Sequence, residues 1–77
     1  MKEGIVTRTP IICDDKAVYG VKFDGKEFLA ESVGTQAVKD YLFVRKGQCI
    51  DIEGNIISNH IEVQNAKINI ASIINIQ

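Results

Sequence analysis

The sequence predicts an all-β domain with one short helix, in which five strands form a small barrel. Ile and Val, whose branched side chains favour strands, make up most of the apolar residues. Asp24-Gly25 separates two alternating runs, which is a strong signal for a β-hairpin. One stretch with helical spacing lies between Gly34 and Gly47. The 77 residues suffice for one domain, so we expect a single barrel over residues 1–77.

The first two expected strands cover residues 4–13 and residues 16–23. Pro10 has no N–H group to donate, so it belongs at an edge, a bulge or a kink of the first strand. Asp14-Asp15 marks the turn between these strands, because both side chains favour turns over strands.

The two-residue turn at Asp24-Gly25 fixes the register of the second and third strands, so that Val21 faces Phe28. Alternate residues of each strand then share one face of the sheet. We assign the more aromatic and less charged face to the interior: Tyr19, Val21, Phe23, Phe28, Ala30 and Ser32. The solvent face carries Val18, Gly20, Leu29, Glu31 and Val33, together with Lys22 and Glu27 as a cross-strand pair.

A short helix is expected over residues 36–45, with Thr35 as its N-cap and Gly47 as its C-terminal stop. Arg45 and Lys46 would then lie in the last turn, where cations favour the helix dipole. We expect an apolar stripe to hold this helix against the sheet, formed by Ala37, Val38, Tyr41 and Leu42.

Residues 48–57 form the fourth expected strand, in which Gly54 indicates a bulge or a sharp bend. After a turn at Ser58-Asn59, the alternating pattern resumes at His60 and becomes irregular near Asn65-Ala66. This last segment is either one long, bulged strand or two short ones. Five strands with a helix between the third and the fourth form the OB-fold, a partly open Greek-key barrel.

Charge and hydropathy limit the classes of partner. The formal net charge is −1, so any nucleic-acid binding must use a local basic patch rather than a general basic field. No apolar run approaches the ~18 residues of a membrane-spanning helix. The N-terminus has no secretory signal. We therefore expect a cytoplasmic protein without a membrane partner.

The sequence shows no apparatus for catalysis. His60 is the one histidine and has no Cys or His at the spacing of a metal site. The acidic residues do not follow the pattern of a calcium loop, and the six glycines are dispersed rather than gathered in a phosphate loop. We expect neither an enzyme nor a bound cofactor.

The stretch from Phe28 to Ile57 resembles the core of bacterial single-stranded-DNA-binding proteins, including their primosomal relatives. The resemblance lies in Val33-Gly34, Ala37, Tyr41-Leu42, Arg45-Lys46-Gly47 and Ile50-Asp51-Ile52-Glu53-Gly54, and downstream in His60–Val63 and Lys67–Ile70. It implies an OB-fold and single-stranded DNA binding in replication, repair or mobile-element maintenance. This chain differs in having Phe43-Val44 inserted before Arg45, and the family's base-stacking aromatics do not carry over.

Single-stranded nucleic acid is bound by a basic groove and by exposed aromatic faces on which the bases stack. Basic residues on the first three strands are the candidates for this contact: Arg8, Lys16, Lys22 and Lys26. The alternative is that these are ordinary surface charges, with Lys22 balanced by Glu27. Phe43 and Val44 are either exposed, as part of a dimer contact, or buried under the barrel.

Three hypotheses follow for the function. The first is a single-stranded nucleic-acid-binding protein that acts as a homodimer or higher oligomer, because one barrel presents only a short groove. The second is a protein-interaction OB module that has lost nucleic-acid binding, in keeping with the acidic Glu27 and Glu31 on the third strand. The third is a structural oligomer whose open strand edges pair with another chain.

Overall fold

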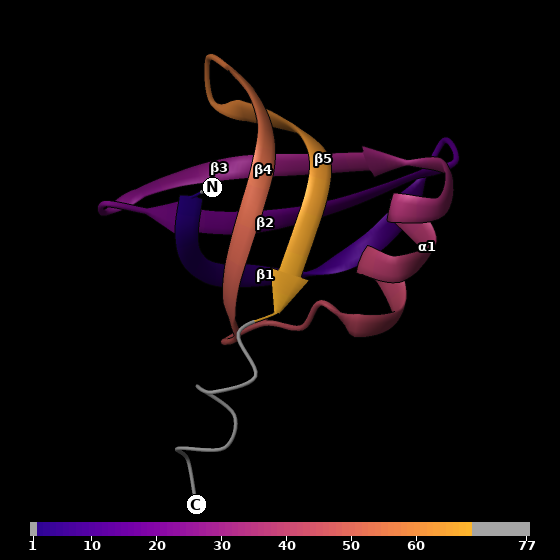
Figure 1. The fold of residues 1–77 in the computed structure, drawn as a ribbon, viewed down its shortest axis with the longest axis horizontal. Coiled ribbons are helices and arrows are strands. Elements are labelled where there is room, and N and C mark those ends of the chain that lie inside the picture. The colour runs from indigo at the N-terminus through magenta and orange to yellow at the C-terminus, as the bar shows by residue number, and fades with distance from the viewer. Residues whose placement is uncertain (1, 69–77) are drawn as a thin grey trace, which may run out of the picture.

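The computed structural model describes residues 2–68, and these form a closed barrel of five strands with one helix. The strand order around the barrel is β1-β2-β3-β5-β4, and α1 lies between β3 and β4 in the chain (Figure 1). The elements are β1 (Lys2–Cys13), β2 (Lys16–Phe23), β3 (Lys26–Val33), α1 (Gly34–Phe43), β4 (Cys49–Ile57) and β5 (His60–Ile68). The predicted OB-like barrel is confirmed. Within these residues, no helix has the length and apolar character needed to cross a membrane.

The β2–β3 hairpin has the predicted register along its whole length, with Val21 opposite Phe28 and Phe23 opposite Lys26. Asp24 and Gly25 both have positive φ, at 50° and 79°, as a type I′ turn requires. The face assigned to the interior does point inward: Tyr19, Val21, Phe23, Ala30 and Ser32 are buried, and Phe28 is half-buried.

Irregular pairing bends the strands enough to close the barrel. In β1, the register with β2 shifts on both sides of Arg8, and Pro10 lies in the second of these shifts. In the β4–β5 hairpin, the register shifts between Glu53 and Gly54. A side chain at Gly54 would overlap the carbonyl oxygen of Glu62, so the close approach of β5 requires glycine there. The bulges expected at Pro10 and Gly54 are thus present, while residues 69–77 of the last segment lie outside the described part.

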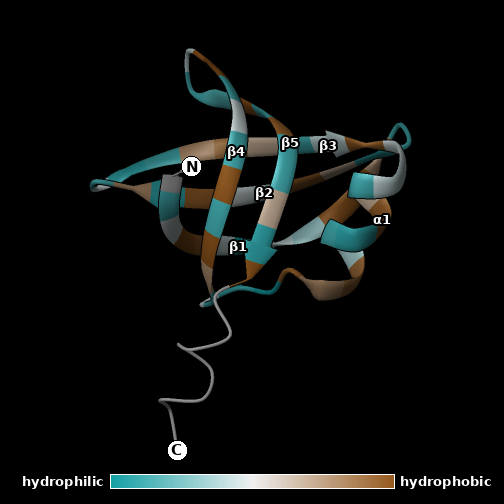
Figure 2. Cartoon of the chain, in the orientation of Figure 1, coloured by the Kyte–Doolittle hydropathy of each residue, from teal (hydrophilic) through white to brown (hydrophobic). Residues whose placement is uncertain are grey.

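The barrel core combines residues from every strand and one residue beyond the helix. Its buried members are Val6, Tyr19, Val21, Phe23, Ala30, Val44, Ile50, Ile52, Ile61 and Val63. Hydrophobic and hydrophilic residues alternate along β4 (Figure 2). Ile50 and Ile52 lie on its buried side.

The bounds and the capping of α1 differ from the prediction. The helix begins at Gly34, follows Val33 as its N-cap without any side-chain cap, and ends at Phe43. Thr35 is therefore not the cap, because Gly34, at φ 62°, turns the chain from β3 straight into the helix. At the other end, Val44 is extended and buried in the core, which stops the helix before Arg45.

Arg45 still interacts with the end of the helix, although it lies beyond the last turn. Its guanidinium donates hydrogen bonds to the carbonyl oxygens of Tyr41 and Val44, at 2.8 and 2.7 Å. These bonds satisfy carbonyl groups that a helix end leaves without an intrahelical partner.

Of the predicted apolar stripe, one residue docks the helix on the barrel. Ala37 is buried, as expected, and the other buried residue of α1 is Asp40. The Tyr19 hydroxyl donates a hydrogen bond to Asp40 at 3.0 Å, and the Gln36 amide donates another at 2.7 Å. Val38, Tyr41 and Leu42 are instead 58%, 46% and 56% exposed. The prediction was wrong for these three, because a carboxylate with hydrogen-bond donors replaces apolar contact at the centre of this interface.

Candidate nucleic-acid interface

The four predicted basic residues lie on the three neighbouring strands β1, β2 and β3. The pairing of Arg8 with Gly20 and of Gly20 with Leu29 defines an outer row of side chains across these strands. Lys16 and Lys22 stand at opposite ends of β2, about 20 Å apart at the rise of an extended strand. Lys26 begins β3, beside the hairpin turn. The structure therefore places all four on one sheet, but it spreads them along the strands rather than gathering them.

Arg8 is held near a carboxylate in the middle of the solvent-facing side of β1, β2 and β3, which we call the outer strand face: Arg8, Lys16, Val18, Gly20, Lys22, Glu27, Leu29, Glu31 and Val33. Its guanidinium lies 3.9 Å from Glu27, and the Thr7 hydroxyl donates a 2.5 Å hydrogen bond to the same carboxylate. The contact crosses β2 at Gly20, where a Cβ would lie 2.5 Å from the Thr7 oxygen. Glycine at this position thus makes room for a polar bridge from β1 to β3. The expected Lys22–Glu27 pairing occurs in the register only, since among the described residues the ion pair of Glu27 is with Arg8.

Lys16 lies at the other end of the sheet, beside a second carboxylate. Its ammonium lies 3.6 Å from Glu31, and His60 of β5 lies 3.0 Å from the same carboxylate. Glu62 is paired in register with Glu31 across the parallel β3–β5 contact, which brings a second carboxylate to this region. The local charge around Lys16 is therefore balanced by acidic groups.

Lys22 and Lys26 are the two predicted residues without an ion pair in the described part of the chain. The Lys26 ammonium lies 5.4 Å from the centre of the Phe28 ring, within the range of a cation–π contact. Phe28 in turn packs against Phe23, with ring centres 5.9 Å apart. This end of the sheet keeps an accessible positive charge beside a half-buried aromatic ring.

The aromatic residues of the β2–β3 hairpin lie on the interior face, as predicted, whereas those of α1 are exposed. All five lie in the described part of the chain: Tyr19, Phe23, Phe28, Tyr41 and Phe43. Tyr19 and Phe23 are buried, so they offer no face to a ligand. Burial raises the pKa of the Tyr19 hydroxyl, and the adjacent Asp40 carboxylate raises it further, so Tyr19 stays neutral and donates to Asp40. Only Tyr41 and Phe43 are exposed, and both belong to α1.

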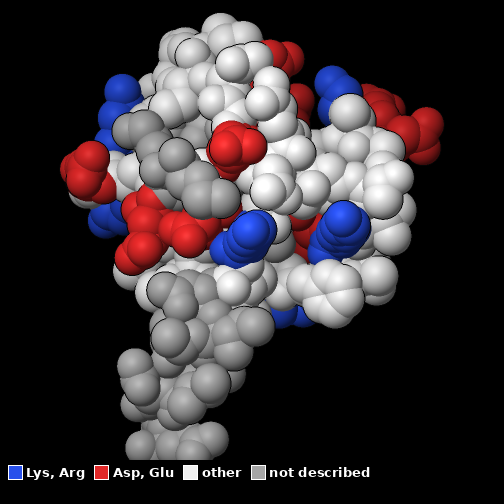
Figure 3. Space-filling model, in the orientation of Figure 1, with Lys and Arg blue, Asp and Glu red and all other residues white. Residues whose placement is uncertain are grey.

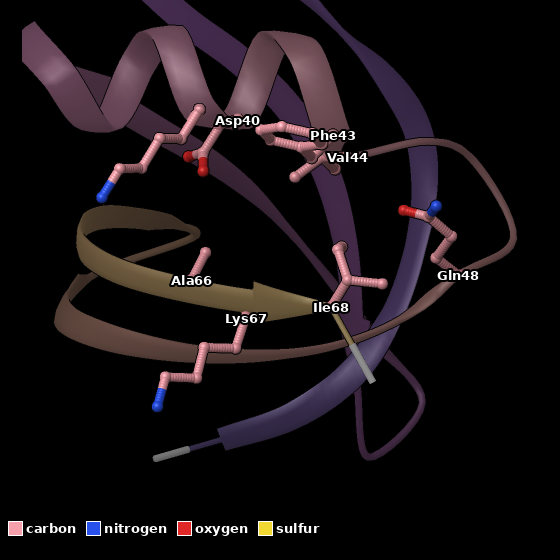
Figure 4. Close-up of a pocket in the computed structure, with 8 residues that line it drawn as sticks. Asp40, Phe43, Val44, Gln48, Ala66, Lys67 and Ile68 are labelled. Atoms are coloured by element: carbon pink, nitrogen blue, oxygen red, sulfur yellow. The ribbon is translucent and has the colours of Figure 1, made fainter. Parts of the chain in front are cut away.

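A hollow of about 620 Å³ lies between the C-terminal end of α1 and the end of β5 (Figure 4). Such a volume falls within the ~300–1,000 Å³ of typical ligand pockets. Eight residues line it: Lys39, Asp40, Phe43, Val44, Gln48, Ala66, Lys67 and Ile68. No pattern in the sequence brings these residues together, although the inserted Phe43-Val44 contributes two of them.

The exposed residues on the other flank of α1 form a separate apolar surface, which we call the α1 apolar surface: Val38, Tyr41 and Leu42. None of these three lines the hollow, although Leu42 is a neighbour of Lys39 on the helix surface, three residues along the chain. The two inserted residues therefore differ in burial: Phe43 is 65% exposed, whereas Val44 is buried.

Comparison with known proteins adds no assignment: no family model matches the chain, and neither a curated protein nor a solved structure shows significant similarity to it. Among the described residues, no three His, Cys, Asp or Glu side chains are grouped as a metal site.

Proposed function

We propose that this protein binds single-stranded nucleic acid, most simply single-stranded DNA, in replication, repair or mobile-element maintenance in the cytoplasm. The observation that carries the proposal is the closed five-stranded barrel with exposed basic residues on three adjacent strands. OB barrels bind oligonucleotides across such strands and the loops beside them. The sequence resemblance of residues 28–57 to single-stranded-DNA-binding proteins supports the same function.

The proposal is tested by fluorescence anisotropy, with a labelled oligothymidine titrated at low and at moderate salt. Binding to phosphates releases counterions, so the logarithm of the association constant falls by about 0.7 per contacted phosphate and per decade of salt. We expect binding at low salt that weakens steeply as salt is added. Absence of binding at low salt and high protein concentration would contradict the proposal.

The α1 apolar surface favours a second candidate function, in which the protein contacts another copy of itself. Val38, Tyr41 and Leu42 are each close to half exposed, and clustered apolar side chains on a surface are typical of contact sites. A dimer formed here would also lengthen the path available to a nucleic acid. Light scattering on the full chain tests this: a dimer mass that Leu42→Asp converts to a monomer supports the contact, whereas a monomer mass at high concentration argues against it.

A further inference from the structure

The hollow between α1 and β5 has an exposed aromatic ring beside apolar residues, and the outer strand face has no such ring. Its wall is largely apolar, with Phe43 and Val44 at the end of α1 on one side and Ala66 and Ile68 of β5 on the other (Figure 4). Phe43 is 65% exposed, so its ring is open to a ligand rather than packed in the core. An exposed aromatic face is what a nucleobase needs for stacking.

The hollow is lined by two lysines, Lys39 and Lys67, and neither forms an ion pair within the described residues. The one carboxylate in the lining is Asp40, whose oxygens already accept hydrogen bonds from Tyr19 and Gln36. Asp51 faces Lys67 across the β4–β5 pair, outside the lining. Figure 3 shows basic side chains over α1 and the end of β5, with acidic ones beside the latter. An anionic ligand therefore finds two lysines without an ion pair beside an apolar wall.

Gln48 adds a hydrogen-bond donor to the same lining. Its side-chain oxygen accepts from the backbone N–H of Arg45 at 2.7 Å, which fixes the orientation of the amide. The amide nitrogen has no partner in the described part of the chain, so it remains available to the carbonyl group of a base.

We propose that this hollow is where the bases of a single-stranded nucleic acid stack, with Phe43 as the platform and Lys39 and Lys67 contacting the flanking phosphates. This assignment rests on the proposed function and adds to it a site that the strand residues do not include. A polymer that alternates flat bases with phosphates fits an aromatic wall between two lysines. An uncharged apolar peptide would leave both lysines without a partner, so the charges favour the nucleic acid.

The direct test compares Phe43→Ala with Ile57→Ala in the anisotropy titration. Both residues are exposed, at 65% and 56%, but Ile57 of β4 lies outside both the hollow and the α1 apolar surface. Loss of one stacked base costs about 1–3 kcal/mol, so we expect Phe43→Ala to weaken oligothymidine binding by about 5- to 150-fold. Ile57→Ala should stay within about twofold, because an exposed residue outside the contact changes little.

A second test replaces the charges. Lys39→Gln combined with Lys67→Gln should lower the salt slope by about 1.4, since each lost phosphate contact removes about 0.7. The matching pair Lys16→Gln with Lys22→Gln removes two cations from the strand face. A greater loss of affinity and slope from the strand pair than from the hollow pair would overturn the assignment.

A spectroscopic test separates stacking from nearby charge. The protein has no tryptophan, so Phe43→Trp introduces a single tryptophan into the hollow, whose emission is separated from that of the two tyrosines by excitation at long wavelength. We expect this variant to bind oligothymidine as well as the parent and to lose tryptophan emission at saturation. Binding without any change in emission would place the bases elsewhere.

The outcomes distinguish the two proposals. If the parent protein binds no oligothymidine, the proposed function fails and the assigned site fails with it. If the parent binds but Phe43→Ala binds equally well, only the site is overturned. Phe43→Ala that abolishes a dimer by light scattering while leaving oligothymidine binding unchanged would identify the hollow as a protein contact, and would equally overturn the assignment.

Discussion

The outer strand face and the hollow beside α1 use their basic residues differently. On the strand face, Arg8 lies beside Glu27, and Lys16 lies beside Glu31. Around the hollow, Lys39 and Lys67 form no ion pair among the described residues, although Asp51 faces Lys67 across the β4–β5 pair. Part of the positive charge of the strand face is thus paired with carboxylates of neighbouring strands, whereas the two lysines of the hollow are not in ion pairs.

The aromatic residues divide the same way. Tyr19, Phe23 and Phe28 of the strands turn inward, because the hairpin register puts them on the core side. Phe43 is exposed because the chain needs Val44, not Phe43, to fill the core after the helix ends. Basic residues alone therefore do not distinguish a candidate site in this barrel. We place the proposed site where lysines without an ion pair lie beside an exposed aromatic ring.

The largest expected effect concerns the contact that positions α1. Asp40→Ala removes the acceptor of two hydrogen bonds and leaves the buried Tyr19 hydroxyl without its partner. We expect the free energy of unfolding to fall by about 3 kcal/mol, since buried hydrogen bonds to a charged group are worth about 1.5–3 kcal/mol each. Urea denaturation measures this loss. A change below about 1 kcal/mol would show that α1 is held by other contacts.

Tyr19→Phe should have a smaller cost and should alter the pH dependence of stability. Removing the hydroxyl costs about 1–2 kcal/mol at neutral pH, because Asp40 keeps its bond from Gln36. The pKa of Tyr19 is raised in the folded state above the value of about 10 in an unfolded chain. In the parent, the contribution of Tyr19 to the free energy of unfolding is therefore fully present below about pH 10 and is lost as the pH rises further. Denaturation between neutral and strongly alkaline pH should show a shallower decline for Tyr19→Phe than for the parent; equal declines would contradict the burial of Tyr19.

Releasing the cations of the strand face should make the two regions more alike. Glu27→Gln with Glu31→Gln frees Arg8 and Lys16 and should strengthen oligothymidine binding by about 3- to 10-fold at low salt, with a steeper salt slope. The matched control is Glu3→Gln with Glu53→Gln, which changes the net charge equally at residues without an ion pair in the described chain. If both double variants bind equally, the strand face contributes only through net charge.

The smallest expected effect tests the docking of the helix. The predicted apolar stripe would make Val38 a core residue, yet its side chain is 58% exposed. We expect Val38→Ala to change the free energy of unfolding by less than about 0.5 kcal/mol, as for other surface substitutions. Urea denaturation at low protein concentration measures it. A loss above about 1.5 kcal/mol would mean that Val38 is buried against the barrel or a second copy.

The sequence predicted the strands better than the helix for a physical reason. A type I′ turn at Asp24-Gly25 leaves one register for β2 and β3, so the inward face follows from counting residues. Gly54 likewise predicted the bulge in β4, because only glycine tolerates the close approach of β5. The docking of α1 depends on Tyr19 meeting Asp40 across 21 residues, and no local pattern encodes that contact.

The candidate site was harder to predict than the fold. Lysines and arginines on strands are visible in the sequence, but their neutralisation by Glu27 and Glu31 depends on pairing across strands. The hollow joins Lys39 and Phe43 of the helix to Lys67 of β5, more than twenty residues away in the chain. Only the closed barrel brings them together.

The most direct test of the central claim is an NMR titration of the uniformly labelled full chain with oligothymidine, following backbone amide shifts. The account predicts that the largest changes fall on residues 39–48 and 66–68, around the hollow. Changes concentrated instead along Arg8, Gly20 and Leu29 would place the nucleic acid on the outer strand face, which keeps the proposed function but contradicts the assignment of the hollow. A spectrum that does not change at low salt would contradict nucleic-acid binding itself.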